Sequence, residues 1–287
     1  MRYASNFSAT WFIRGIGFLW LLIGLANRPV RAAEVLRWMV EDNPPFFAVQ
    51  EPWKGAGIGD QSMEILFQRL VSFENRIVPA DTSRAFYEIT HRDGICIFAT
   101  TVPPEIADKV KISERSFMLP GYRFIIPADR YKDFAPMLTA AGEIDLGAIS
   151  RGAPLHGAYL GATPSKSIAD LIDRRNPGFR LEAAPEQGRL LGLLHAGRVD
   201  FLLAEGWTVI AYNFGFPADP RPMNMHIKGV PAFLERRIVC SDRALGRKAI
   251  AAIDMLESSD EFWRTLVSPY EPALSADDFS ALLTSRH

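Results

Sequence analysis

The stretch at positions 35–70 constrains the fold of this 287-residue chain most strongly, because it reads as strand, rigid loop, glycine loop and helix. Apolar residues at 35–40 predict a short strand, which Pro44 and Pro45 end because proline fixes the backbone and removes an amide donor. Three glycines then allow tight turns: Gly55, Gly57 and Gly59. Apolar residues recur with helical spacing over 61–72, so one face of that helix must be buried.

The segment before this stretch has the pattern of a secretory signal peptide at positions 1–32. Arg2 and Arg14 precede an apolar run over 15–26, and Val30-Arg31-Ala32 resembles a cleavage site. An uncleaved membrane anchor is the alternative, but a spanning helix needs about 20 apolar residues and this run is shorter. We therefore expect cleavage, no lipid attachment because the leader has no cysteine, and a soluble periplasmic product.

The two cysteines, Cys96 and Cys240, lie in apolar segments that we expect to be strands. In an oxidising compartment they could form a single intramolecular disulfide. The other interpretation is two buried free thiols, because cysteine packs as a small hydrophobic residue. The sequence leaves both open.

Composition excludes some partner classes. The chain is 48% hydrophobic and 23% charged, as in ordinary globular proteins. Its formal charge of −1 becomes about −5 when the four arginines of the leader are removed, so no basic field favours a nucleic acid. The sequence also has no metal-ligand spacing and no phosphate loop, and we expect no cofactor and a monomer.

The order of expected elements occurs twice along the chain. The first half predicts strands and helices alternating as in a parallel α/β sheet: strand 35–40, helix 61–72, a strand near Ile77, helix 82–90 and strand 95–100. The second half predicts the same alternation: strand 144–149, helix 167–174, strand 179–183, helix 185–196 and strand 199–204. Two similar α/β lobes are implied.

Extended segments connect these lobes. Positions 110–117 and 122–126 lead from the first to the second, and the apolar strand 236–240 leads back. Three amphipathic helices at 242–256, 260–267 and 275–283 would pack on the first lobe. The predicted lobes are 33–122 with 238–287, and 123–237. Such lobes, joined by two crossings, can close on a ligand by hinge motion.

Several motifs in this order resemble the type II periplasmic solute-binding proteins of ABC uptake systems, specifically the family 3 group with polar amino acid binders. The motifs are NPPFF with its glycine loop and Asp60, ATTVPPEIADKVKIS, DLGAISRG, and LLHAGRVDFLLAEGWTVIAYN. The last is the most specific, with a leucine-rich helix, Gly-Arg-Val-Asp and a strand that ends in an acid. The resemblance covers most of the mature chain. It implies a small-molecule ligand between two lobes, and an ABC permease or a membrane receptor as partner.

The resemblance also implies ligand-binding residues. Phe46, after the Pro-Pro turn, would pack on the ligand, and Glu205 would take a ligand ammonium. Ser150, Arg151 and Gly152 would receive a carboxylate, since a helix N-terminus favours an anion and arginine can add a bidentate contact. Asp60 is better explained as a helix cap.

The sequence departs from the family at the arginine that usually clamps the ligand α-carboxylate. Ile106 occupies that position. Arg84 or Arg115 could substitute, and Thr100 in the hinge approach completes the candidate set. A ligand without an α-carboxylate explains the departure equally well.

Two other classes of function compete with transport. Ala148 to Gly152 approximates the G-x-S-x-G turn of serine hydrolases, with alanine at the first glycine, and some relatives on this fold are dehydratases, for which Glu205 would be the general acid. A sensory role, read by a membrane receptor, needs the same ligand-selected closed state as uptake. We expect a binding protein that performs no covalent chemistry.

Overall fold

The computed structural model describes residues 33–51, 53–151, 155–160, 179–217 and 219–285. Apart from the first residue of β1, every described element lies in one compact unit, Val35–His287. The expected signal peptide, the helix expected at 167–174 and Gly152 fall outside the described residues. Within the described residues, no helix is long and apolar enough to cross a membrane.

The first of two five-stranded sheets has the strand order β2-β1-β3-β10-β4. Its strands are β1 (Glu34–Val40), β2 (Phe73–Pro79), β3 (Ile95–Thr100), β4 (Val110–Pro120) and β10 (Phe233–Ser241). Strands β1 and β3 are parallel, whereas β10 is antiparallel to both β3 and β4. The parallel sheet expected from the alternation of elements is therefore mixed, because the two crossing segments, β4 and β10, join it as well.

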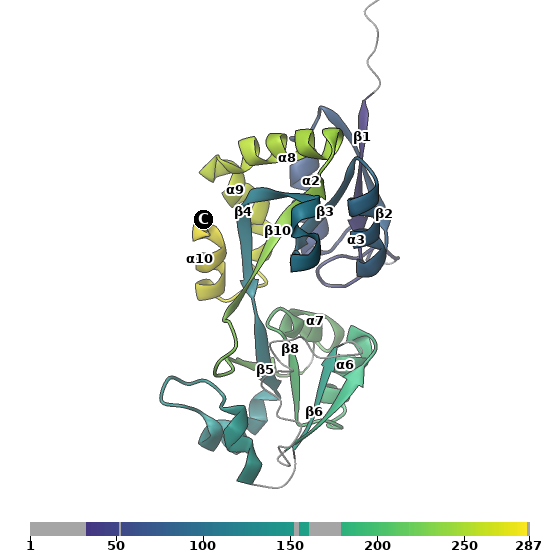
Figure 1. Ribbon diagram of the computed structural model, residues 1–287. Helices are drawn as coiled ribbons and strands as arrows, with labels where there is room; N and C mark the ends of the chain where they lie inside the picture. The colour runs from purple at the N-terminus through teal and green to yellow at the C-terminus, as the bar shows by residue number, and fades with distance from the viewer. Residues whose placement is uncertain (1–32, 52, 152–154, 161–178, 218, 286–287) are drawn as a thin grey trace, which may run out of the picture. The chain divides into compact units, whose positions relative to one another are not determined.

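Helices cover both faces of this sheet (Figure 1). They are α2 (Ile58–Phe67), α3 (Thr82–His91), α8 (Ala244–Glu257), α9 (Asp260–Val267) and α10 (Ala276–Thr284), with short 3-10 helices at Pro104–Lys109 and Ser268–Tyr270. Successive strand residues point to opposite faces. Trp38 joins the core under α2, α8 and α9, while its neighbour Met39 joins the core under α3. Burial on both faces explains why these strands are continuous apolar runs.

The second sheet has the order β7-β6-β8-β5-β9. Its strands are β5 (Tyr122–Ile126), β6 (Leu155–Leu160), β7 (Phe179–Ala184), β8 (Phe201–Glu205) and β9 (Met223–Met225). Strand β6 is parallel to β7 and β8, and β5 is antiparallel to β8 and β9. One face carries α6 (Gln187–His195) and α7 (Thr208–Gly215), and the other carries α4 (Tyr131–Phe134) and the 3-10 helices Ala135–Met137 and Leu146–Arg151. A further 3-10 helix, Ala128–Arg130, directly precedes α4.

The strand expected at 144–149 is wrong. Ile144 makes only isolated bridges, and a 3-10 helix, Leu146–Arg151, follows it. Leu146 and Ile149 are both buried, and their spacing of three residues suits a 3-10 turn rather than the two-residue period of a strand. Sheet membership changes between Pro120 and Tyr122. The lobe boundaries after residues 122 and 237 remain predictions.

Cys96 and Cys240 form a disulfide with an S–S distance of 2.00 Å. They are register partners on β3 and β10, so the pairing of these neighbouring strands places one cysteine opposite the other. The bond joins residues 144 positions apart in the sequence. It therefore ties the return strand of the chain to the middle of the first sheet.

Candidate functional site

A pocket of about 100 Å³ lies where β1 and β3 end and α3 begins. Its lining combines apolar and aromatic side chains with polar and charged ones: Met39, Glu41, Asn43, Phe46, Phe47, Ala80, Thr82, Ala85, Phe86, Ile97, Phe98, Ala99, Thr100 and Arg236. Parallel strands direct their carboxyl ends to one edge of a sheet, where ligands of α/β proteins usually bind. This pocket is therefore the candidate ligand site.

The loop that carries Phe46 is fixed by the start of α2. The amide of Gly59 donates to the Phe46 carbonyl (2.7 Å), and a Cβ on Gly57 would lie 2.4 Å from that same oxygen. Asp60 Oδ2 accepts from the amides of Gly57 (3.0 Å) and Ala48 (2.8 Å). Burial raises the pKa of Asp60 even though both bonds favour the carboxylate. Asp60 thus caps the helix and positions the aromatic loop.

The backbone is strained beside the pocket. Ala99 has φ +48°, a left-handed conformation that residues with a Cβ rarely adopt. Ala99 and the next residue, Thr100, both line the pocket. A strained backbone conformation persists where the surrounding contacts hold it in place, and such conformations are concentrated at binding and active sites.

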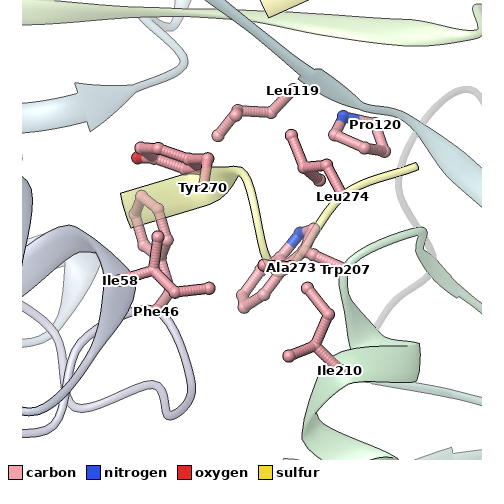
Figure 2. Close-up of a pocket in the computed structure, with 9 residues that line it drawn as sticks. All are labelled: Phe46, Ile58, Leu119, Pro120, Trp207, Ile210, Tyr270, Ala273 and Leu274. Atoms are coloured by element: carbon pink, nitrogen blue, oxygen red, sulfur yellow. The ribbon is translucent and has the colours of Figure 1, made fainter. Parts of the chain in front are cut away.

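Phe46 is buried in an aromatic cluster. Its ring centroid lies 4.6 Å from that of Phe47, 5.5 Å from Trp207 and 6.0 Å from Tyr270. With Trp207 and Tyr270 it also lines a small second cavity of about 10 Å³, whose other lining residues are Ile58, Leu119, Pro120, Ile210, Ala273 and Leu274 (Figure 2). Burial raises the pKa of Tyr270, whose hydroxyl has no hydrogen-bond partner within the described residues.

Glu205, at the end of β8, is held by an arginine. Arg236 Nη2 lies 2.6 Å from Glu205 Oε1 and 2.8 Å from Oε2, and Trp207 Nε1 also donates to Oε2. Both charged side chains are mostly buried, with 18% exposure for Arg236 and 17% for Glu205. Glu205 thus has an intramolecular cation where the resemblance implies a ligand ammonium.

Of the other residues predicted for the site, some line the pocket and others lie outside it. Thr100 lines the pocket with Phe46, while Arg84 is exposed on α3 and lies outside the lining. The 3-10 helix Leu146–Arg151 contains Ser150 and Arg151, whose side chains lie outside the description, as does Gly152.

Arg115 is buried away from the pocket. Its Nη1 donates to the Glu257 carbonyl (3.0 Å) and to Asp260 Oδ1 (3.2 Å), and its guanidinium lies 4.5 Å from the Trp263 ring centroid. These contacts hold α8 and α9 together. The structure therefore does not bring this arginine to the site as a substitute clamp.

Sequence reasoning missed both charged residues of the pocket lining, Glu41 and Arg236, and of these Arg236 had a signal in the sequence. Its signal was an arginine at the start of the apolar strand 236–240, two and four residues before the buried Ile238 and Cys240. A two-residue period places Arg236 on their inward face. A buried cation on such a face needs a partner, and this requirement could have singled it out.

No protein-family model matches the sequence, and no curated protein matches it. Solved structures do match. An ancestral cationic amino acid solute-binding protein, AncCDT-1, aligns with a TM-score of 0.62 at 13% identity, over 84% of this chain and 96% of that one. The GluR0 ligand-binding core in complex with L-glutamate aligns with a TM-score of 0.59 at 15% identity, over 85% of this chain and 100% of that one.

A third match is an amino acid ABC transporter substrate-binding protein from Streptococcus pneumoniae bound to L-arginine. Its TM-score is 0.54 at 9% identity, over 88% of this chain and 92% of that one. The alignments span nearly the whole length of each of these proteins, and both α/β sheets with their flanking helices are matched. The chain therefore has the two-lobed fold of the type II periplasmic binding proteins.

Proposed function

We propose that this protein is a periplasmic solute-binding protein that captures a small polar or anionic ligand and delivers it to an ABC-type uptake system. The observation that carries the proposal is the pocket at the ends of β1 and β3, where aromatic side chains, Thr100 and Arg236 converge beside a strained backbone. An apolar pocket with a few polar groups is the usual form of a small-molecule site.

The structural neighbours support a solute-binding role while leaving the ligand class open. They include a cationic amino acid binder, a complex with L-glutamate and a complex with L-arginine. Proteins of this fold thus accept ligands of opposite charge. The ligand class must therefore come from the charged groups of this pocket, Glu41 and Arg236.

A thermal-shift screen of the secreted protein tests the proposal. The panel contains amino acids, organic acids, amines and sugars, and the protein is first unfolded and refolded to remove carried-over ligand. A ligand at 100 times its Kd adds about 2.7 kcal/mol to the free energy of unfolding. For a protein of this size that raises Tm by roughly 5 to 10 °C.

The exposed Arg189 on α6 provides a control for the screen. The Arg189→Gln variant should give the same shift as the wild type, because its side chain lies outside the pocket lining. A flat response of the wild type to all four compound classes would contradict the binding role.

We propose that the protein catalyses no reaction on its ligand. Glu205, the general acid that a dehydratase would need, accepts hydrogen bonds from Arg236 and Trp207, so both of its carboxyl oxygens are already engaged within the protein. One neighbour is described as a precursor of cyclohexadienyl dehydratase, so the fold itself does not decide this point. Mass spectrometry of a bound ligand after long incubation should return it unchanged, and a converted product would establish an enzyme.

Export is part of the same proposal. Mass spectrometry of the N-terminus of the protein isolated from a periplasmic extract should show a chain that begins at Ala33, as the cleavage pattern predicts. A product that retains Met1 in the membrane fraction would contradict the cleaved leader.

A further inference from the structure

The pocket has a cation whose hydrogen-bonding capacity is only partly used. Among the described residues, Glu205 is the only hydrogen-bond partner of the Arg236 side chain, and both Glu205 oxygens approach the same nitrogen, Nη2. Arg236 Nε is buried without a partner, and Nη1 makes no hydrogen bond to the described part of the chain. A buried polar group without a partner calls for an explanation.

The geometry of this ion pair leaves room for a better acceptor. A carboxylate bound in the usual bidentate way spans two guanidinium nitrogens with one oxygen on each. Glu205 instead places both oxygens on Nη2. A carboxylate that spans Nη1 and Nη2 would use a donor that Glu205 leaves unused, but it has to replace Glu205 at Nη2.

Glu205 keeps one hydrogen bond when it gives up Arg236. Trp207 Nε1 donates to it independently, and about a sixth of its side chain is exposed. An ammonium ligand, in contrast, would have to compete with a guanidinium that already neutralises Glu205. Glu41 also lines the pocket, but its Oε2 already accepts a hydrogen bond from Thr82 Oγ1 (2.6 Å). Arg236 Nη1 makes no hydrogen bond within the described residues, and this unused donor favours an anionic acceptor at Arg236.

We infer that the ligand is a small carboxylate with an apolar body and that it binds Arg236 in place of Glu205. When the ligand is absent, Glu205 forms the ion pair with Arg236 and so competes with the ligand for this arginine. This inference rests on the proposed solute-binding function and assigns its ligand class. Phe46, Phe47, Phe86 and Phe98 line the same pocket as Arg236 and provide the surface for the apolar body. The family resemblance of the sequence implied instead that Glu205 binds an ammonium group of the ligand.

Three probes with the same aromatic body and different head groups separate these roles: phenylacetate, 2-phenylethylamine and 2-phenylethanol. Isothermal titration calorimetry compares the wild type with Glu205→Gln, which keeps the hydrogen-bonding shape but removes the charge. Because the neutral glutamine of this variant competes less strongly for Arg236, phenylacetate should bind the variant about tenfold more tightly, or more, than the wild type. The amine and the alcohol should bind more weakly than phenylacetate in both proteins.

Glu235→Gln is the matched control. Glu235 is the residue before Arg236 on β10, is 52% exposed and pairs with Arg237, so the substitution removes the same charge without touching Arg236. Phenylacetate should bind this variant and the wild type equally. Arg236→Gln should lose phenylacetate binding, and the double variant Arg236→Gln with Glu205→Gln, which leaves no unpaired buried charge, should lose it as well while remaining folded by circular dichroism.

The opposite results overturn the inference. Absence of phenylacetate binding, equal phenylacetate affinity in Glu205→Gln and Glu235→Gln, or 2-phenylethylamine binding that Glu205→Gln abolishes would each do so. In these cases any ligand found in the thermal-shift screen would leave the binding function standing. If the screen also finds no ligand, both proposals fail.

Discussion

At the scale of single residues, the buried Glu257 on α8 makes stability depend on pH. Burial raises its pKa to about 8, with the nearby Asp254 adding to the shift, and neither carboxyl oxygen has a hydrogen-bond partner within the described residues. The folded protein keeps this proton while the unfolded chain loses it near pH 4.5. The stabilising contribution is therefore complete below pH 4.5 and declines as pH rises, until it is lost above pH 8.

Glu257→Gln tests this prediction because glutamine is close in shape and does not ionise. Urea unfolding at pH 5 and pH 9 should give similar free energies for both proteins at the lower pH. At the higher pH the wild type should be less stable than the variant by a few kcal/mol at most. If both proteins lost the same stability between the two pH values, Glu257 would not be the group responsible.

Residue by residue, the sequence named some side chains of the candidate pocket but none of the contacts between them. Phe46, which the resemblance implied, and Thr100, named in the hinge approach, both line the candidate pocket, whereas Arg84 and Arg115 do not. The pairing of Glu205 with Arg236 joins β8 to β10. Such a contact depends on the packing of distant strands, which no local pattern encodes.

At the scale of elements, the disulfide between β3 and β10 should contribute strongly to stability. A cross-link over 144 residues restricts the unfolded chain, and removing a native disulfide typically costs about 2 to 5 kcal/mol. The double variant Cys96→Ala with Cys240→Ala should unfold at a lower urea concentration than the wild type. Reductant should destabilise the wild type only. Two titratable thiols in the unfolded protein, purified without reductant, would contradict the bond.

The helix at the start of the site gives a second prediction at this scale. Asp60→Ala removes the acceptor of the Gly57 and Ala48 amides and should lower the free energy of unfolding by about 1 to 2 kcal/mol. Gln61→Ala, at the exposed next position, is the control and should change it little. Equal urea midpoints for the two variants would show that the cap does not hold the loop.

Periodicity predicted most elements of the first sheet because their apolar residues are long, regular runs. Strand β6 was missed because Gly157 interrupts its pattern. A Cβ at Gly157 would lie 2.4 Å from the Phe201 ring, so the glycine marks a close approach of β6 to a neighbouring strand. Strand directions could not be read from composition, because they follow from how the two crossing segments join the sheets.

For the molecule as a whole, we propose that one small ligand binds in the pocket between β1, β3 and α3. Thr82 lines this pocket, while Ser83, the next residue of α3, is exposed outside it. Isothermal titration calorimetry of the best compound from the thermal-shift screen should therefore show binding to the wild type and to Ser83→Trp. It should show no binding to Thr82→Trp, whose indole would fill the pocket. Unchanged affinity in Thr82→Trp, with the protein folded, would contradict the assignment of this pocket.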